Sequence, residues 1–204
     1  MPICSARSFY ALLAASILLT MTGSAQAVSF DGFTCITNND AGNCAIGQAQ
    51  LSADLTGDVL TITMAGTDAA VVEQVFIQAA GVAGGSFLDG VGIVEFGNAN
   101  AGGNLPGGNA VGFVSAINFA ASNPAPKDGI GYHVQDTAQL QLGRFQLEGD
   151  LSDLRVGVHV IGFRSGGSES FTTSTPGAPV PEPSAALVFG IGTLVIGTRV
   201  RTRR

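Results

Sequence analysis

The sequence contains few of the residue types that enzymes and ligand-binding proteins commonly use. Among its 204 residues there are no tryptophans, two tyrosines, two histidines and three cysteines. Tyr10 lies in an N-terminal segment with the features of a removable leader, which leaves only Tyr132. A sugar site built on flat aromatic side chains is therefore disfavoured. His133 and His159 both occupy strand-like positions, where a histidine is more often structural than catalytic.

Positive charge is also scarce. Residues 28–179 contain four lysines or arginines and fourteen aspartates or glutamates, a net charge of −10. A surface of this sign repels phosphate backbones, so we expect no nucleic acid partner. The whole chain has a charge of only −6 because its other five arginines lie in the two terminal segments.

Recognisable nucleophile motifs are missing as well. No serine stands in a Gly-x-Ser-x-Gly pattern, and Ser165 and Ser168 belong to a Gly/Ser-rich turn. The twelve phenylalanines are expected to fill a core. We predict no catalytic residues, no cofactor and no enzymatic activity.

The first 27 residues have the order of a secretory signal peptide. Arg7 supplies the positive start, residues 11–21 form an apolar run too short to span a bilayer, and Ala25-Gln26-Ala27 is a small-residue cleavage site. We expect cleavage between Ala27 and Val28.

Removal of this peptide takes Cys4 away and leaves Cys35 and Cys44. An even pair in an exported chain predicts a disulfide. A loop this short contributes about 2–3 kcal/mol in the chain-entropy model. Oxidation would also remove a thiol nucleophile, and two cysteines alone are too few for a structural zinc site.

Residues 28–173 are expected to form one all-β domain, a single antiparallel β-sandwich of jelly-roll-like type, without a strong helix. Residues 51–55 and 60–64 alternate in polarity around Gly57-Asp58 and predict a β-hairpin. Further strands are predicted at residues 71–78, 91–97 and 111–120, with long loops at residues 97–110 and 121–129.

Two later segments carry finer predictions. In residues 138–150 the apolar parity changes between Leu142 and Phe145, which predicts either a β-bulge at Gly143-Arg144 or a break between two short strands. Around residue 157 alternation is regular. One face carries Leu154, Val156, Val158 and Val160, and the face with Arg155 and His159 should be wetter.

The C-terminal part has three pieces. Residues 174–183 form a Ser/Thr/Pro linker, and residues 184–198 an uncharged run of about 22 Å as a helix. Arg199 can extend this length by snorkelling, and the arginines at 199, 201, 203 and 204 should stay cytoplasmic. We therefore predict a single transmembrane helix and basic tail over residues 184–204.

This end resembles the PEP-CTERM sorting signal of exported proteins of Gram-negative bacteria. The matching residues are Val180-Pro181-Glu182-Pro183-Ser184, the short apolar run and Arg-x-Arg-x-Arg-Arg. The resemblance implies Pro181, Glu182 and Pro183 as the sorting motif, and an exosortase-type processing enzyme as partner. It also implies a transient stay in the inner membrane, a final place at the cell surface or extracellular matrix, and an association with exopolysaccharide and biofilm.

The middle of the chain is similar to a group of such proteins with no assigned activity, through FTCITNN, AIGQAQLSADL, NLPGGNA and LRVGVHVIGFRSGGSESF. The expected role is therefore structural or adhesive. One alternative is a calcium-binding module using Glu148, Asp150 and Asp153 or Asn38, Asn39 and Asp40. Others are a carbohydrate-binding module using Asn98, Asn100, Asn104 and Asn109, and a hydrolase of matrix polysaccharide, which needs a cleft with paired carboxylates.

Overall fold

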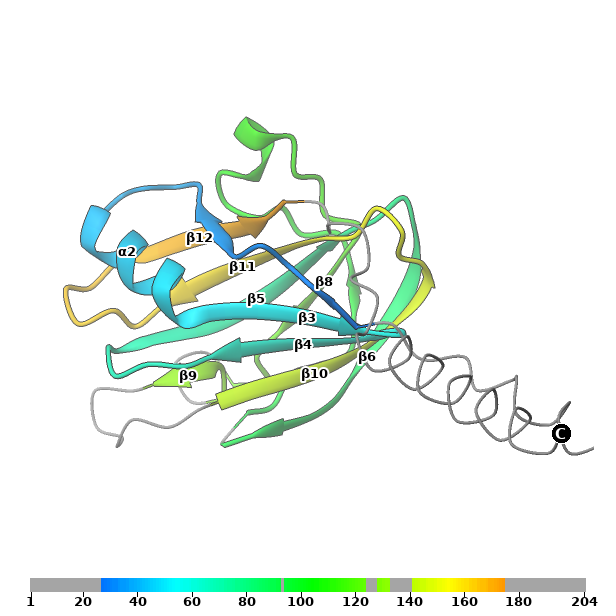
Figure 1. Ribbon diagram of the computed structural model, residues 1–204, viewed down its shortest axis with the longest axis horizontal. Coiled ribbons are helices and arrows are strands. Elements are labelled where there is room, and N and C mark those ends of the chain that lie inside the picture. Colours follow the sequence, from blue (N-terminus) through cyan, green and yellow to red (C-terminus); the bar gives the residue numbers. More distant parts are fainter. Residues whose placement is uncertain (1–26, 93, 124–127, 133–140, 175–204) are drawn as a thin grey trace, which may run out of the picture.

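The computed structural model describes residues 27–92, 94–123, 128–132 and 141–174. These residues form two antiparallel β-sheets and one short α-helix (Figure 1). The predicted signal peptide up to residue 26, the sorting motif Pro181, Glu182 and Pro183, and the predicted membrane helix lie outside the described residues. Within the described part of the chain, no helix is both long and apolar enough to cross a membrane.

The first sheet has five strands in the order β1-β3-β4-β10-β6. Their bounds are β1 Ala27–Ser29, β3 Leu51–Thr56, β4 Val59–Met64, β10 Gln141–Asp150 and β6 Gly81–Val91. The second sheet has the order β2-β12-β11-β5-β8-β7, and β9 also pairs with β5. Its strands are β2 Phe33–Cys35, β12 Ser168–Thr173, β11 Arg155–Ile161, β5 Ala70–Gln78, β8 Ile117–Ala120, β7 Asn100–Ala101 and β9 Ile130–Tyr132.

The core between the two sheets confirms the all-β, sandwich-like prediction. The hairpin β3–β4 closes through Gly57-Asp58, and Gly57 takes the positive φ of 62° that such a turn favours. Phe145 of β10 lies at the centre of an aromatic cluster, with ring centroids 4.8–5.5 Å from those of Phe87, Phe96 and Phe119. Side chains from both sheets thus meet in one core.

Strand β11 has the predicted buried face, since Leu154, Val156, Val158 and Val160 are all fully buried. Its opposite face is the wetter one, as predicted, because Arg155, His159 and Ile161 are only partly buried, and Gly157 is the exception. Gly157 is buried on that side because Leu105 and Phe113 lie over it, from the connection that contains the 3₁₀ turn η1 Gly108–Val111. The absence of a Cβ at Gly157 lets this connection pack closely on the sheet, since a Cβ there would come within 2.7 Å of Leu105.

One sequence prediction for a strand is wrong, and a second one is too long. The described residues of the range 91–97 form no strand beyond the last residue of β6, and Phe96 makes only an isolated bridge with Ala121. The long strand in this region is β6, which lies just before these residues. It contains four glycines, so its sequence lacks the apolar alternation from which strands were predicted. The predicted strand at residues 111–120 is reduced to β8.

The parity change in β10 also has a different explanation. Strand β10 is continuous and runs in unbroken register along β4, so neither a bulge at Gly143-Arg144 nor a break exists. Leu142 lies on the outer face with Arg144, and Gly143 fills the inward position beneath Ile130. The register shift occurs on the neighbouring strand β6, where Leu88 is skipped between the pairs Arg144–Asp89 and Phe145–Phe87.

The domain contains a helix that the sequence analysis did not predict, α2 Ala41–Gln50. Its sequence AGNCAIGQAQ has few apolar residues and no clear helical stripe, so periodicity could not find it. The helix begins because the carboxylate of Asp40 accepts hydrogen bonds from the backbone N–H groups of Gly42 and Asn43. It packs against β2 and β12 at one end of the sandwich, as Figure 1 shows.

Candidate functional site

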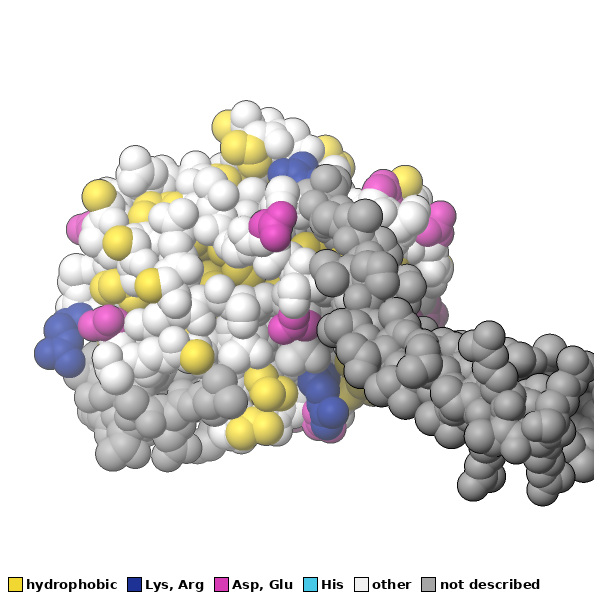
Figure 2. Space-filling view, viewed as in Figure 1, with side chains coloured by type: hydrophobic (Ala, Val, Ile, Leu, Met, Phe, Trp, Pro, Cys, Tyr) yellow, Lys and Arg dark blue, Asp and Glu magenta, His cyan; other side chains and the backbone are white. Residues whose placement is uncertain are grey.

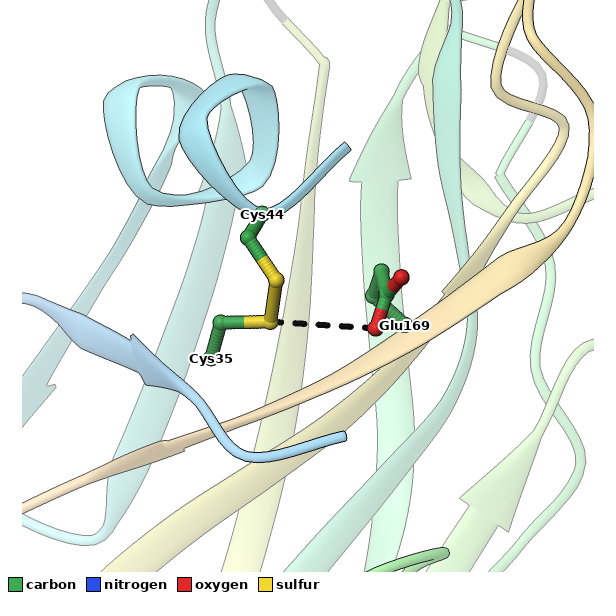
Figure 3. Close-up of side chains that lie close together, drawn as sticks. All are labelled: Cys35, Cys44 and Glu169. Carbon is green, nitrogen blue, oxygen red and sulfur yellow. Dashed lines mark hydrogen bonds between the residues drawn. A yellow bond between two sulfur atoms is a disulfide. The ribbon is translucent and has the colours of Figure 1, made fainter. Parts of the chain in front are cut away.

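The most distinctive chemistry of the described residues gathers where α2 meets strands β2 and β12. Cys35 at the end of β2 and Cys44 in α2 form the predicted disulfide, with their Cα atoms 5.5 Å apart. Glu169 of β12 points toward the same bond (Figure 3). Three elements that are distant in sequence therefore meet at one point, which we call the α2 corner.

Glu169 is fully buried, and its carboxylate is held by three donors from a single loop. The Thr37 hydroxyl donates to Oε2 at 2.5 Å, the Asn39 backbone N–H donates to Oε2 at 3.1 Å, and the Asp40 N–H donates to Oε1 at 2.7 Å. Among the described residues no lysine or arginine pairs with it. Hydrogen-bond donors, rather than an opposite charge, therefore compensate the burial of this carboxyl group.

The loop between β2 and α2 is organised around this carboxylate. Asn38 has a positive φ of 49°, a backbone conformation that asparagine adopts more readily than most residues. Thr37 Oγ1 accepts from the Ser170 backbone N–H at 2.9 Å while its hydrogen points to Glu169. The Asp40 that bonds to Glu169 through its N–H also caps α2 through its side chain. Glu169 thus fixes the residue that starts the helix.

The sulfur atoms lie close to polar groups. Cys35 Sγ is 3.8 Å from Glu169 Oε2, and Cys44 Sγ is 3.5 Å from Asn38 Oδ1. A disulfide sulfur carries no hydrogen, so these approaches are contacts and not hydrogen bonds in the oxidised chain. In the reduced chain each sulfur would carry a proton facing an acceptor.

A surface cleft of about 360 Å³ opens beside the α2 corner. Its polar lining is held in place by hydrogen bonds: the Ser165 hydroxyl donates to Asn43 Oδ1 at 2.6 Å, and Asn43 Nδ2 donates to the Gly166 carbonyl at 3.0 Å. The cleft is lined by Asp40, Gly42, Asn43, Ile46, Asp68, Ala69, Arg164 and Ser165. Most of the exposed lining surface is nevertheless apolar, and a few amide, hydroxyl, carboxylate and guanidinium groups are set into it, a mixture that is common in ligand pockets.

The two histidines give no accessible catalytic pair among the described residues. His133 lies outside them. His159 Nδ1 lies 3.2 Å from Ser170 Oγ, but Ser170 is fully buried and cannot meet a substrate. Burial lowers the pKa of His159 below its usual 6.5, although the charges of Glu73 and Glu169 pull the other way. Ser165 lies in the turn before β12, as predicted, whereas Ser168 is the first residue of β12.

The acidic residues considered as calcium ligands serve as backbone acceptors. Asp150 accepts from the Ser152 N–H, which is the main cause that lowers the Asp150 pKa, and Asp153 accepts from the Ala80 N–H through both carboxylate oxygens. Asp40 caps α2, and Asn39 Nδ2 donates to the Ser168 carbonyl. Within the described residues, the carboxylates of Asp40, Glu148, Asp150 and Asp153 do not come together as a set of metal ligands.

The asparagines considered for carbohydrate binding, Asn98, Asn100, Asn104 and Asn109, are all exposed along the connection from β6 to β8. Ala27 and Val28 begin the described chain in β1, and nothing in the structure tests cleavage between them.

Sequence reasoning did not identify Glu169 as a structural centre. One signal was present, since Glu169 has the same strand parity as Phe171, and Phe171 is a core residue. The partners of the carboxylate lie about 130 residues away, between Thr37 and Asp40, and only the pairing of β2 with β12 brings them together.

Comparison of the chain with protein-family models, with curated proteins and with solved structures gives no match in any of the three.

Proposed function

We propose that this chain is an exported protein that an exosortase-type enzyme sorts to the cell surface or extracellular matrix of a Gram-negative bacterium, where it has a structural or adhesive role without catalysis. The observation that carries the proposal is the three-part C-terminal segment: the Pro181-Glu182-Pro183 step, the short uncharged run and the arginine tail. A single transmembrane helix with a basic tail over residues 184–204 and a jelly-roll-like strand arrangement belong to the proposal.

The physical logic of sorting follows from this segment. A span of about 22 Å is shorter than the hydrocarbon core, and the arginines prevent complete export. The chain would be held briefly in the inner membrane with the proline-rich step outside. Two prolines keep this step extended, which suits the cleft of a processing enzyme. Glu182 is the motif's only charge and serves as a recognition group.

The described domain is compatible with an extracellular structural role. It carries a disulfide, which persists in oxidising compartments, and its surface carries few charges. Figure 2 shows a small number of charged side chains spread over one face of the described domain, some with opposite charges side by side, between uncharged surface. The buried Ser170 beside His159 also supports a role without serine-based catalysis.

Fractionation of cells carrying tagged chains tests the sorting. Glu182→Ala, or deletion of residues 199–204, should change the compartment or the C-terminus of the recovered protein. Ser174→Ala in the linker and Thr202→Ala in the tail are matched controls, because they leave the motif and the arginines intact, and they should behave as wild type. If both test variants reach the wild-type compartment with the wild-type C-terminus, sorting by this segment is wrong.

Carbohydrate binding is a second candidate, because the cleft beside the α2 corner places Asp68, Arg164 and Ser165 around a partly apolar surface, and sugars need both kinds of contact. Arg164 is exposed at its rim and makes no ion pair among the described residues, so it could contact a sugar carboxylate or hydroxyl. Affinity electrophoresis in gels containing alginate or dextran would reveal binding as retarded migration. Equal retardation of wild type and Arg164→Gln, or no retardation in either gel, would argue against this cleft.

A further inference from the structure

We infer that the reduced form of the chain binds Zn²⁺ through Cys35, Cys44 and Glu169, and that oxidation to the disulfide abolishes the site. The inference is independent of the proposed sorting. It rests on the way the fold brings a buried carboxylate to a cysteine pair.

The fold already gathers the three side chains at one point. The two sulfur atoms and a carboxylate oxygen of Glu169 all lie within 4.8 Å of one another. Zinc–sulfur bonds of about 2.3 Å and zinc–oxygen bonds of about 2.0–2.2 Å place tetrahedral ligand atoms roughly 3.4–3.8 Å apart. The Cys35 Sγ to Glu169 Oε2 distance is already 3.8 Å. The two sulfurs must separate, which breaking their bond allows, and Cys44 Sγ, now within 4.8 Å of the carboxylate, must come to bonding distance of the same ion.

The surroundings favour a cation once the bond is broken. Cys44 and Glu169 are buried, and among the described residues no positive side chain pairs with the carboxylate. Without a metal the two sulfurs stay protonated, and a divalent cation compensates the charge of the two thiolates that form when it binds. Thiolate ligands select zinc over calcium or magnesium. Cys44 Sγ lies 3.5 Å from Asn38 Oδ1, so an amide oxygen is close to the fourth position, which water could also fill.

The loop hydrogen bonds orient the third ligand. Thr37 and Asn39 donate to Glu169 Oε2, and Asp40 donates to Oε1, so the carboxylate is held in place. A metal on Oε2 takes the site of one of these hydrogen bonds, and the Thr37 hydroxyl can rotate to release it. This arrangement corresponds to the outer-shell contacts that orient ligands in known metal sites. Cys35 is only partly buried, which provides a path for the ion from solvent.

The chemistry balances with a phosphine as reductant. The phosphine gives two electrons to the disulfide, water supplies the oxygen of the phosphine oxide, and its two protons go to the sulfurs. Zn²⁺ then replaces both thiol protons, which are released to solvent. Reoxidation requires the metal to leave, because each sulfur binds zinc as a thiolate and loses its thiolate charge when the sulfur–sulfur bond forms.

The test uses the full chain in mild detergent with Cys4→Ser, so that Cys35 and Cys44 are the only cysteines. Co²⁺ serves as the probe, because thiolate ligation gives a charge-transfer band in the near ultraviolet that added Zn²⁺ removes. The reduced chain should show this band, saturating at one Co²⁺ per chain, and the oxidised chain should show none. Replacing Glu169 with glutamine should weaken binding at least about tenfold, as loss of metal-site contacts does elsewhere.

Asp150→Asn is the matched control, because it neutralises an exposed acid far from the sulfurs, and it should bind like wild type. If Glu169→Gln loses its fold by circular dichroism, Glu169→Asp keeps the charge on a shorter side chain and should bind with intermediate affinity. A reduced chain without the band would overturn the inference. So would equal affinity in a folded Glu169 variant, which would indicate a simple two-thiol adduct, or equal binding by the oxidised chain.

Discussion

Gly47 is the position at which the structure makes its sharpest energetic prediction. The helix α2 lies so close to β12 that a Cβ on Gly47 would meet three ring carbons of Phe171 at 2.1, 2.7 and 2.8 Å. Phe171 is fully buried in the core, so its ring cannot swing into solvent. Gly47→Ala must therefore move the helix away from the strand or distort the packing of the ring.

Two effects of opposite sign compete in this variant. Alanine is favoured over glycine inside a helix by about 0.5–1 kcal/mol. Overpacking of a well-filled core costs about 1–3 kcal/mol, and contacts this short place the cost toward the upper end. We expect Gly47→Ala to lower the free energy of unfolding by about 1–2 kcal/mol, a fall in Tm of roughly 2–8 °C for a chain of this size.

Thermal unfolding followed by far-ultraviolet circular dichroism measures this change, with the full chain in mild detergent. Gln48→Ala is the matched control, since it lies on the exposed side of the same helix and should leave Tm nearly unchanged. Phe171→Leu should be less harmful in the Gly47→Ala background than alone, with a coupling of about 0.5–3 kcal/mol. A Tm for Gly47→Ala at or above the wild-type value would refute the close packing of α2 on Phe171.

The disulfide and the buried histidine give two further predictions. Mass spectrometry of exported protein without reduction should show one linked peptide pair joining Cys35 and Cys44, and two alkylatable thiols would contradict it; replacing both with serine should cost about 2–3 kcal/mol of stability. Burial lowers the pKa of His159 from its usual 6.5, so the unfolded chain binds a proton at this histidine more readily than the folded chain does. The free energy of unfolding is therefore unaffected by His159 above pH 6.5 and falls as the pH drops from 6.5 toward the pKa of the folded state. His159→Gln should flatten the fall in Tm between about pH 7.5 and about pH 5, and an unchanged slope would show that other groups cause it.

Much of the fold follows from local pattern. The alternation of Leu60, Ile62 and Met64 and the turn at Gly57-Asp58 predict β3 and β4, and the four-residue apolar face ending at Val160 predicts β11. Each depends on neighbouring residues only, because strand periodicity and turn chemistry are properties of a few consecutive positions. The cysteine pair was predictable by counting, given the predicted removal of Cys4 with the N-terminal segment.

The misses have a common origin in packing between distant segments. Strand β6 is rich in glycine and is held by its pairing with β10, and β10 accommodates Gly143 inward because Ile130 fills the space above it. Helix α2 lacks an apolar stripe and forms because Asp40 caps it, Cys44 ties it to β2 and Gly47 allows it to rest on Phe171.

The sequence by itself determined the class of the domain, its predicted route out of the cell and the identity of the cysteine pair, because these depend on periodicity, on contiguous signals and on counting. Only the tertiary structure decided that Glu169 would lie beside that pair. The donors between Thr37 and Asp40 lie about 130 residues earlier in the sequence, and the pairing of β2 with β12 brings them to the carboxylate of Glu169. Without these donors the burial of that carboxylate would be too unfavourable.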